Sequence, residues 1–396
     1  MTSQAQSRAA SSTRALHLLL AFANFAVGMG AFVVIGVLSP VASDFAVSKA
    51  EAGWLMTIYA IVYAVASPVL AATTGRMDRA HVLVTGLVVL ALGAALAALA
   101  PSYAVLLVAR TLMAAGGALI TPVAMAVGAA SVEPPQRGKA LATIYTGFTL
   151  AQVLGIPAGA WLGYAFGWRW AFGILAGFAL IAAAVLYRQV PRGLAAAPNS
   201  LKILGSLLAA ARPMWAVMFT VFFLSALFVL YTYIAPFLEA RHGLGRTGIT
   251  AMLLVFGLAG VLGNAIGGFL TDRIGSVRTL AALCVAQIVL MPFLTLTYLP
   301  LIATGVAIAL WSLSSWSVHV PQQARLAALD PQHAPVLLAL HAGGLYVGGS
   351  VGSAIGGLAL ERWGVDALGP TGAAFAVLAL ASLAIVARLP GAARPS

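Results

Sequence analysis

Residues 267–278 read Gly-Gly-Phe-Leu-Thr-Asp-Arg-Ile-Gly-Ser-Val-Arg, a short charged stretch where the apolar run 248–270 gives way to the run 279–298. Each run is close to the length of about 20 residues that an α-helix needs to cross the hydrocarbon core of a bilayer. Charged side chains are costly inside that core. We therefore predict two membrane-spanning helices joined by a short polar connection.

The same pattern extends along the whole chain. Of its 396 residues, 62% are hydrophobic and only 8% are charged, whereas about 25% are charged in ordinary soluble domains. This composition excludes a soluble enzyme and predicts an all-α membrane protein with twelve transmembrane helices. Ten further runs have a suitable length: 16–38, 54–73, 82–100, 103–125, 140–165, 168–187, 213–238, 300–320, 335–359 and 370–387.

The interval 188–212 divides the runs into two groups of six. We expect a six-helix bundle in residues 1–187, a cytoplasmic linker in 188–212 and a second six-helix bundle in 213–396. An Asp-Arg pair follows the second run at Asp78 and the eighth run at Asp272, which indicates pseudo-symmetric halves. Internal repeats of this kind are common in secondary transporters.

The net charge of +12 is distributed unevenly across the expected membrane. With the N-terminus inside, fifteen Lys and Arg residues fall on the cytoplasmic side, Arg325 among them, and five fall outside. The positive-inside rule then predicts an inner-membrane protein with both termini in the cytoplasm. The charge is interpreted as topological bias and not as a nucleic-acid site. The single cysteine, Cys284, permits neither an internal disulfide nor a cysteine-based metal site.

The connection from Gly268 to Arg278 matches the G-x-x-x-D-R-x-G-x-x-R loop motif and resembles the major facilitator superfamily. Further stretches are similar to its twelve-helix drug and sugar efflux branch: 32–55, 106–119, 154–172 and 231–239. The resemblance implies export of a small organic solute by alternating access, with protons exchanged in return. Departures from that branch include Ala31, where an acidic residue is frequent, and the altered spacing around Asp78.

Candidate coupling or gating residues follow from the positions of the charges. All nine acidic residues fall near the ends of the runs, so no mid-membrane carboxylate is present to carry a proton. Arg110 is the one strong base within a predicted span, and the resemblance implies coupling or gating; snorkelling to the interface is the alternative. His341 is the best titratable candidate within a predicted span, because the unperturbed pKa of histidine is close to neutral pH; a packing histidine is the alternative. Asp272 and Arg273 are expected to act as a conformational latch.

Polar and aromatic residues within the runs predict a substrate cavity that is aromatic and mostly uncharged. Tyr145, Thr149 and Gln152 follow one helix face, at i, i+4 and i+7. Helix–helix hydrogen bonding is the alternative for each member. The candidate cavity residues are Asn24, Tyr145, Thr149, Gln152, Tyr231, Tyr233 and Trp316.

Glycines recur every four residues at Gly155, Gly159 and Gly163 and again in the series 344–356, which favours close helix packing. Pro157 interrupts the first series, and the segment 155–159 resembles the efflux-antiporter signature without its Gly-Pro dipeptide. Gly268 is also expected at a helix contact.

These observations predict a transporter and not an enzyme, because no metal-ligand cluster, nucleophile–base set or phosphate loop is present in the sequence. The expected solute is drug-like, a sugar or a nucleoside. An uptake permease or uncoupled facilitator of the same fold is one alternative, and a membrane-embedded sensor or enzyme is another. We expect a monomer in the lipid bilayer, with no cofactor, metal or nucleic acid and with protons as the candidate co-substrate.

Overall fold

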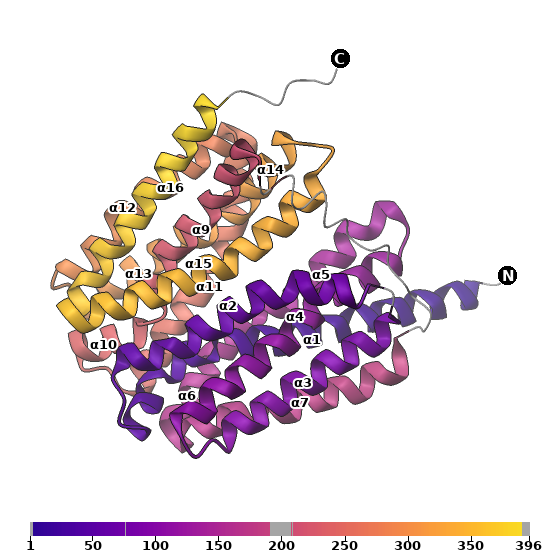
Figure 1. Ribbon diagram of the computed structural model, residues 1–396, viewed down its shortest axis with the longest axis horizontal. Coiled ribbons are helices and arrows are strands. Elements are labelled where there is room, and N and C mark those ends of the chain that lie inside the picture. The colour runs from indigo at the N-terminus through magenta and orange to yellow at the C-terminus, as the bar shows by residue number, and fades with distance from the viewer. Residues whose placement is uncertain (1–2, 76, 191–206, 208, 390–396) are drawn as a thin grey trace. The chain divides into compact units, whose positions relative to one another are not determined.

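The computed structural model describes residues 3–75, 77–190, 207 and 209–389, and within these ranges the secondary structure is helical, without strands. Twelve helical segments are long and apolar enough to cross a membrane, and each of the twelve predicted runs overlaps one of them. The predicted all-α fold with twelve transmembrane helices is confirmed (Figure 1). Residues 191–206 and 208 of the expected linker lie outside the described residues.

The chain forms two compact units. The first contains residues 1–41 and 62–199, and the second contains 42–61 and 200–396. Residues 42–61 group with the second unit. They include the first half of α2, so a single helix is shared between the two units.

The first unit is built around α3, which packs against both α4 and α7 (Figure 1). Polar residues define where its helices begin, since Asp78 accepts a hydrogen bond from the Ala80 amide and Ser102 accepts one from the Val105 amide. Its elements are α1 (Ser3–Asp44), α2 (Lys49–Thr73), α3 (Arg79–Ala98), α4 (Tyr103–Ala130), η1 (Pro134–Gln136), α5 (Arg137–Leu150), η2 (Ala151–Gly155), α6 (Ile156–Phe166) and α7 (Trp168–Gln189).

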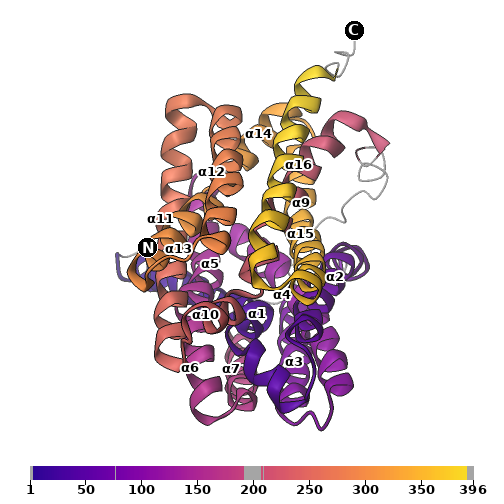
Figure 2. The same ribbon diagram turned by 90° about the vertical axis from the view of Figure 1, so that its left-hand side faces the viewer.

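The second unit is built around α9, which packs against both α15 and α16 (Figure 2). α11 packs against α13, and α12 packs against α16. Its elements are α9 (Ala211–Tyr231), α10 (Ile234–His242), α11 (Arg246–Ile274), α12 (Ser276–Leu296), α13 (Leu301–Trp316), α14 (His319–Leu329), α15 (Ala334–Trp363), η3 (Val365–Ala367) and α16 (Leu368–Arg388).

Three of the predicted spans are interrupted. The fifth contains the π-helical turn η2, which ends two residues before Pro157, and the missing amide hydrogen of this proline cannot continue an α-helical ladder. The seventh breaks at Thr232 and Tyr233. The tenth breaks after Trp316 and resumes as α14, which continues to Leu329 and not only to the predicted residue 320.

The glycine series lie where backbones approach closely. A Cβ atom added at Gly348 would lie 2.6 Å from the carbonyl oxygen of Val221 on α9. In the first unit, Gly155, Gly159 and Gly163 face side chains of α1. Gly268 differs from its expected role, because a Cβ there would be 3.8 Å from its nearest neighbour. The close approach belongs to Gly267, one residue and therefore about 100° around the helix away.

Candidate functional site

Arg110 lies on α4 and is fully buried. Its Nη1 donates a hydrogen bond to the carbonyl of Gly30, and its Nη2 donates one to the carbonyl of Ala31 at 3.0 Å. The planar guanidinium thus holds two consecutive carbonyls of α1 within the first unit. This arrangement is that of a buried clamp and not of a side chain snorkelling to an interface.

The polar stripe of the first unit follows α5 and the π-helical turn. Tyr145 is 38% exposed and its ring lies 5.4 Å from that of Phe148, while Thr149 and Gln152 are half-buried. Asn24 is fully buried on α1, where its amide nitrogen donates to the carbonyl of Leu20 at 3.0 Å. The amide oxygen of Asn24 has no hydrogen-bond partner among the described residues.

The second unit contains a row of aromatic rings, which we call the aromatic row. Tyr231 stacks on Phe256 with ring centroids 4.2 Å apart, and Trp316 meets Tyr231 edge-on at 6.5 Å. His319 lies 5.6 Å from Trp316 and 6.2 Å from His341. The structure therefore places two candidate cavity residues, Tyr231 and Trp316, in one row with His341.

Tyr233 does not belong to the aromatic row. It is fully buried, and its hydroxyl donates to the carbonyl of Ser353 on α15 at 2.8 Å. The Ser353 hydroxyl in turn donates to the carbonyl of Gly53 on α2 at 3.1 Å. Tyr233 thus holds α15 beside the first half of α2, where it lines a small pocket apart from the aromatic row.

His341 ends a chain of hydrogen bonds that sequence reasoning missed. Its Nδ1 lies 2.9 Å from the Thr220 hydroxyl, which lies 3.1 Å from the amide nitrogen of Gln322. Arg325 donates to the Gln322 amide oxygen at 3.4 Å. These four residues are at least nine-tenths buried, and we call them the His341 relay.

A signal for the relay was present in the sequence. His319, Gln322 and Arg325 recur at intervals of three residues, the spacing of one helix face. The predicted span ends at residue 320, which places Arg325 among the cytoplasmic charges. In the structure Pro321 lies in the first turn of α14, where proline is tolerated, and Arg325 lies inside the helical segment.

The loop motif ends α11 and begins α12. Gly275 has φ of 83°, a left-handed conformation that favours glycine and that separates the two helices. Asp272 and Arg273 are exposed in the last turn of α11, and the Arg273 guanidinium lies 4.5 Å from the Phe269 ring centroid. Asp78 instead precedes α3 as its N-cap, so the two aspartates occupy different positions relative to their helices.

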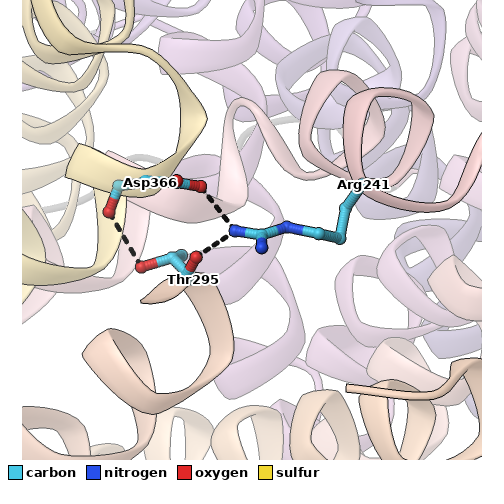
Figure 3. Close-up of polar contacts among 3 residues, drawn as sticks. All are labelled: Arg241, Thr295 and Asp366. Atoms are coloured by element: carbon cyan, nitrogen blue, oxygen red, sulfur yellow. Dashed lines mark hydrogen bonds and ion pairs between the residues drawn. The ribbon is translucent and has the colours of Figure 1, made fainter. Parts of the chain in front are cut away.

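α10 is bound on two sides by charged contacts. Arg241 donates to the carbonyl of Thr295 at the end of α12 and to the Asp366 carboxylate of η3 at 2.5 Å (Figure 3). The Thr295 hydroxyl donates to the Asp366 carbonyl at 3.0 Å. Lys49 pairs with Glu239 at 2.7 Å. These contacts fix α10 beside α2, α12 and η3 within the second unit.

We expect Arg241→Met to lower the thermal unfolding midpoint of the purified protein more than Asp366→Asn. The Arg241 side chain is 4% exposed, whereas the Asp366 side chain is 50% exposed and its ion pair is screened by water. Losing Arg241 leaves a buried carbonyl without its donor, an effect of about 1–3 kcal/mol. Equal shifts in the two variants would show that the ion pair, and not the carbonyl contact, stabilises this end of α10.

The acidic residues keep to helix ends in the structure as well. None of the nine lies in the middle of a described span, and no group of three or more His, Cys, Asp or Glu among the described residues is placed to hold a metal ion.

At the end of α14, burial would raise the pKa of Asp330, but hydrogen bonds from His333 outweigh it and lower that pKa. Cys284 is a free thiol and fully buried.

The described residues form twelve membrane-length helices in two compact units, and interrupted helices carry buried polar residues, an architecture typical of polytopic helical transporters. Residues 20–335 match the family model of the Major Facilitator Superfamily. The chain belongs to this superfamily.

Named relatives agree with this assignment. The chain is similar to the uncharacterized MFS-type transporter YbcL of Bacillus subtilis, with 32% identity over 93% of this chain and 94% of the relative. It is 29% identical to the inner membrane transport protein YdhP of Escherichia coli K12, over 87% of this chain and 88% of the relative.

A solved structure shares the fold. The inward-facing, occupied crystal structure of a bacterial homolog to the human lysosomal transporter Spinster superposes with a TM-score of 0.78. It covers 95% of this chain and 97% of its own, at 18% identity.

Proposed function

We propose that the chain exports a small organic solute across the bacterial inner membrane by alternating access. The solute is drug-like, a sugar or a nucleoside, and protons are the candidate exchanged ion. The observation that carries the proposal is the aromatic row, which gathers aromatic rings and two histidines, buried or half-buried, within one unit. The family of the chain and the description of YdhP as an inner membrane transport protein support membrane transport.

The export direction is supported by the segment 155–159. It resembles the efflux-antiporter signature, and it forms the junction between the π-helical turn and α6, packed on α1. A π-helical turn in a long helix frequently marks a functional position. We propose that this junction adjusts when the transporter changes its access.

The test is solute flux in proteoliposomes of known orientation, with a panel of drug-like molecules, sugars and nucleosides and with or without a pH gradient. Export coupled to protons requires flux toward the external side that accelerates when the gradient is applied. Flux in the opposite direction would support an uptake permease. Absence of flux for every solute would revive a membrane-embedded sensor or enzyme.

An uncoupled facilitator is the second candidate. The absence of a mid-span carboxylate among the described helices favours it, because a buried carboxyl is the usual group whose raised pKa allows proton exchange near neutral pH. Flux that follows the solute gradient in both directions and is indifferent to pH would support this candidate over the antiporter.

We propose that both termini lie in the cytoplasm. Tyr298 and Gln332 then lie on opposite sides of the membrane, and both are exposed in connections between helices. A membrane-impermeant maleimide is expected to label Tyr298→Cys in intact cells but Gln332→Cys only after permeabilisation. The buried Cys284 keeps the parent unlabelled. The reverse pattern would invert the topology.

Asp272→Asn is expected to lower the transport rate much more than the affinity for the solute. Asp272 and Arg273 lie at the α11–α12 connection, and we propose that they form contacts with opposed helix ends in one access state only. The measurement is initial flux over a range of solute concentrations, with Ser276→Ala as a control in the same connection. Equal maximal rates in Asp272→Asn and the parent would contradict the proposal that Asp272 and Arg273 act as a latch.

A further inference from the structure

The His341 relay has a definite direction of hydrogen bonding, which begins at Gln322. The Ala216 carbonyl can only accept, so the Gln322 atom that lies 2.8 Å from it must be the amide nitrogen. Arg325 can only donate, so the Gln322 atom that faces it must be the amide oxygen. Two partners of opposite character therefore fix the orientation of this amide.

The direction passes through Thr220 to the imidazole. Because Gln322 donates to the Thr220 hydroxyl oxygen at 3.1 Å, the hydroxyl hydrogen is free for the His341 Nδ1 at 2.9 Å. If Nδ1 accepts this hydrogen, the ring proton resides on Nε2. The other tautomer, with the proton on Nδ1, would leave the Thr220 hydrogen without that acceptor.

The charges around the relay also favour a neutral ring. The titratable groups nearest to His341 are His319 and Arg325 on α14. Arg325 in turn interacts electrostatically with Arg212 on α9 and Cys284 on α12. No acidic side chain forms an ion pair with Arg325 or His341 in the described part of the chain. Asp330, at the end of α14, binds His333 at 2.8 Å. A second proton on His341 would therefore add a positive charge near Arg325, without an acidic partner among the described residues.

The Nε2 atom of His341 is left as an unused donor. It is buried and has no hydrogen-bond partner among the described residues, while the ring as a whole is 2% exposed and lies next to His319 at the end of the aromatic row. A buried polar group without a partner is unusual and calls for an explanation. A ligand that reaches the row in another access state would supply the missing acceptor.

We propose that His341 is a fixed neutral Nε2–H donor for an acceptor oxygen of the transported solute, with Gln322 and Arg325 as its positioning residues. This proposal deepens the proposed function and rests on it, and it replaces the expectation that His341 carries a proton. The matching ligands are neutral or anionic organic molecules with a hydroxyl, carbonyl, phosphoryl or carboxylate oxygen. Cations without an acceptor are not recognised by His341.

The tautomer is tested by solid-state NMR of the full chain in lipid, labelled with ¹⁵N-histidine and assigned by comparison with His341→Gln. We expect a neutral ring protonated on Nε2 from about pH 5.5 to pH 8, the range in which an unperturbed histidine titrates. Thr220→Val removes the hydroxyl donor, so we expect its ¹⁵N spectrum to show both neutral tautomers of His341 instead of one. Thr304→Val is the matched control, because Thr304 pairs with His242 at 2.9 Å and not with His341. Imidazolium at pH 6–7, or a proton on Nδ1, would overturn the proposal.

The ligand class is tested on the same resonance with two probes of similar shape, triethylphosphine oxide and tetraethylammonium. Only the phosphine oxide has an acceptor oxygen, so it alone is expected to shift the Nε2 signal. In Gln322→Leu, the oxide concentration needed for half of that shift is expected to rise at least about tenfold, as loss of one positioned hydrogen bond predicts. A shift by tetraethylammonium alone, or by neither probe, would overturn the ligand assignment. Solute flux is measured separately. If the oxide shifts the signal but the protein shows no flux, the proposed transport function is rejected while the assignment of His341 as a donor stands.

Discussion

Arg110→Lys is expected to reduce solute flux at least about tenfold, because lysine cannot hold both α1 carbonyls that the guanidinium holds. The side chain is fully buried and donates from two nitrogens to Gly30 and Ala31. A hydrogen bond from a charged donor contributes about 1.5–3 kcal/mol, and about 1.4 kcal/mol corresponds to a factor of ten. The variant keeps the positive charge, so the loss reports on the planar fork of donors and not on charge.

The measurement is the initial rate of flux in proteoliposomes, normalised to folded protein. Arg169→Lys serves as the control in the same unit, since Arg169 donates to the Ala100 carbonyl at 3.0 Å but is only partly buried. We expect this control to remain within about twofold of the parent, as substitutions outside buried networks usually do. Parent-like flux in Arg110→Lys would restrict Arg110 to a packing role and leave coupling to other residues.

The twelve spans were predictable because they depend on composition averaged over about 20 residues. Single errors at a boundary, such as the end of the tenth span at residue 320, leave that average unchanged. An average over a window does not report how one residue, such as a proline, affects the helix boundary. Pro321 marks a helix end in one context and a first turn in another, and only the packing of α14 on α9 and α15 decides between them.

The candidate site was predictable in part. Tyr231, Trp316 and His341 were chosen for their polar or aromatic character at membrane depth, and the structure places all three in or beside one row. Tyr233 has the same character and a neighbouring position, yet it points toward Ser353. Two successive steps of about 100° already place Tyr231 and Tyr233 on roughly opposite sides of a helix, and residue type alone does not report that difference.

Partner choice across helices was the least accessible feature. Thr220 is an ordinary residue in an apolar run, and its role follows only from its distances to Gln322 and His341. The same limit explains Gly268, where a motif indicated a packing glycine and the helix register assigns the contact to Gly267. A sequence shows which residues can form a contact, whereas the rotation of each helix decides which of them do.

Gly352→Ala is expected to destabilise the protein strongly, although alanine is the better helix former. A Cβ at Gly352 would clash with the Ser225 carbonyl oxygen and lie 2.9 Å from the Ser225 Cα on α9, and backbone atoms cannot move aside as a flexible side chain can. Overpacking of this kind costs about 1–3 kcal/mol. Since α15 packs along α9 for much of its length, separating the two helices at one turn also loosens the neighbouring turns.

Gly343→Ala is the matched control on the same helix, because a Cβ there would meet nothing within 4 Å. With the steric term absent, only helix propensity remains, and it favours alanine over glycine by about 1 kcal/mol. We therefore expect the thermal unfolding midpoint to fall in Gly352→Ala and to rise or stay unchanged in Gly343→Ala, measured on purified protein in one detergent. A fall of equal size in both would mean that glycine serves helix flexibility in α15, and the close contact with α9 would no longer explain the series from Gly344 to Gly356.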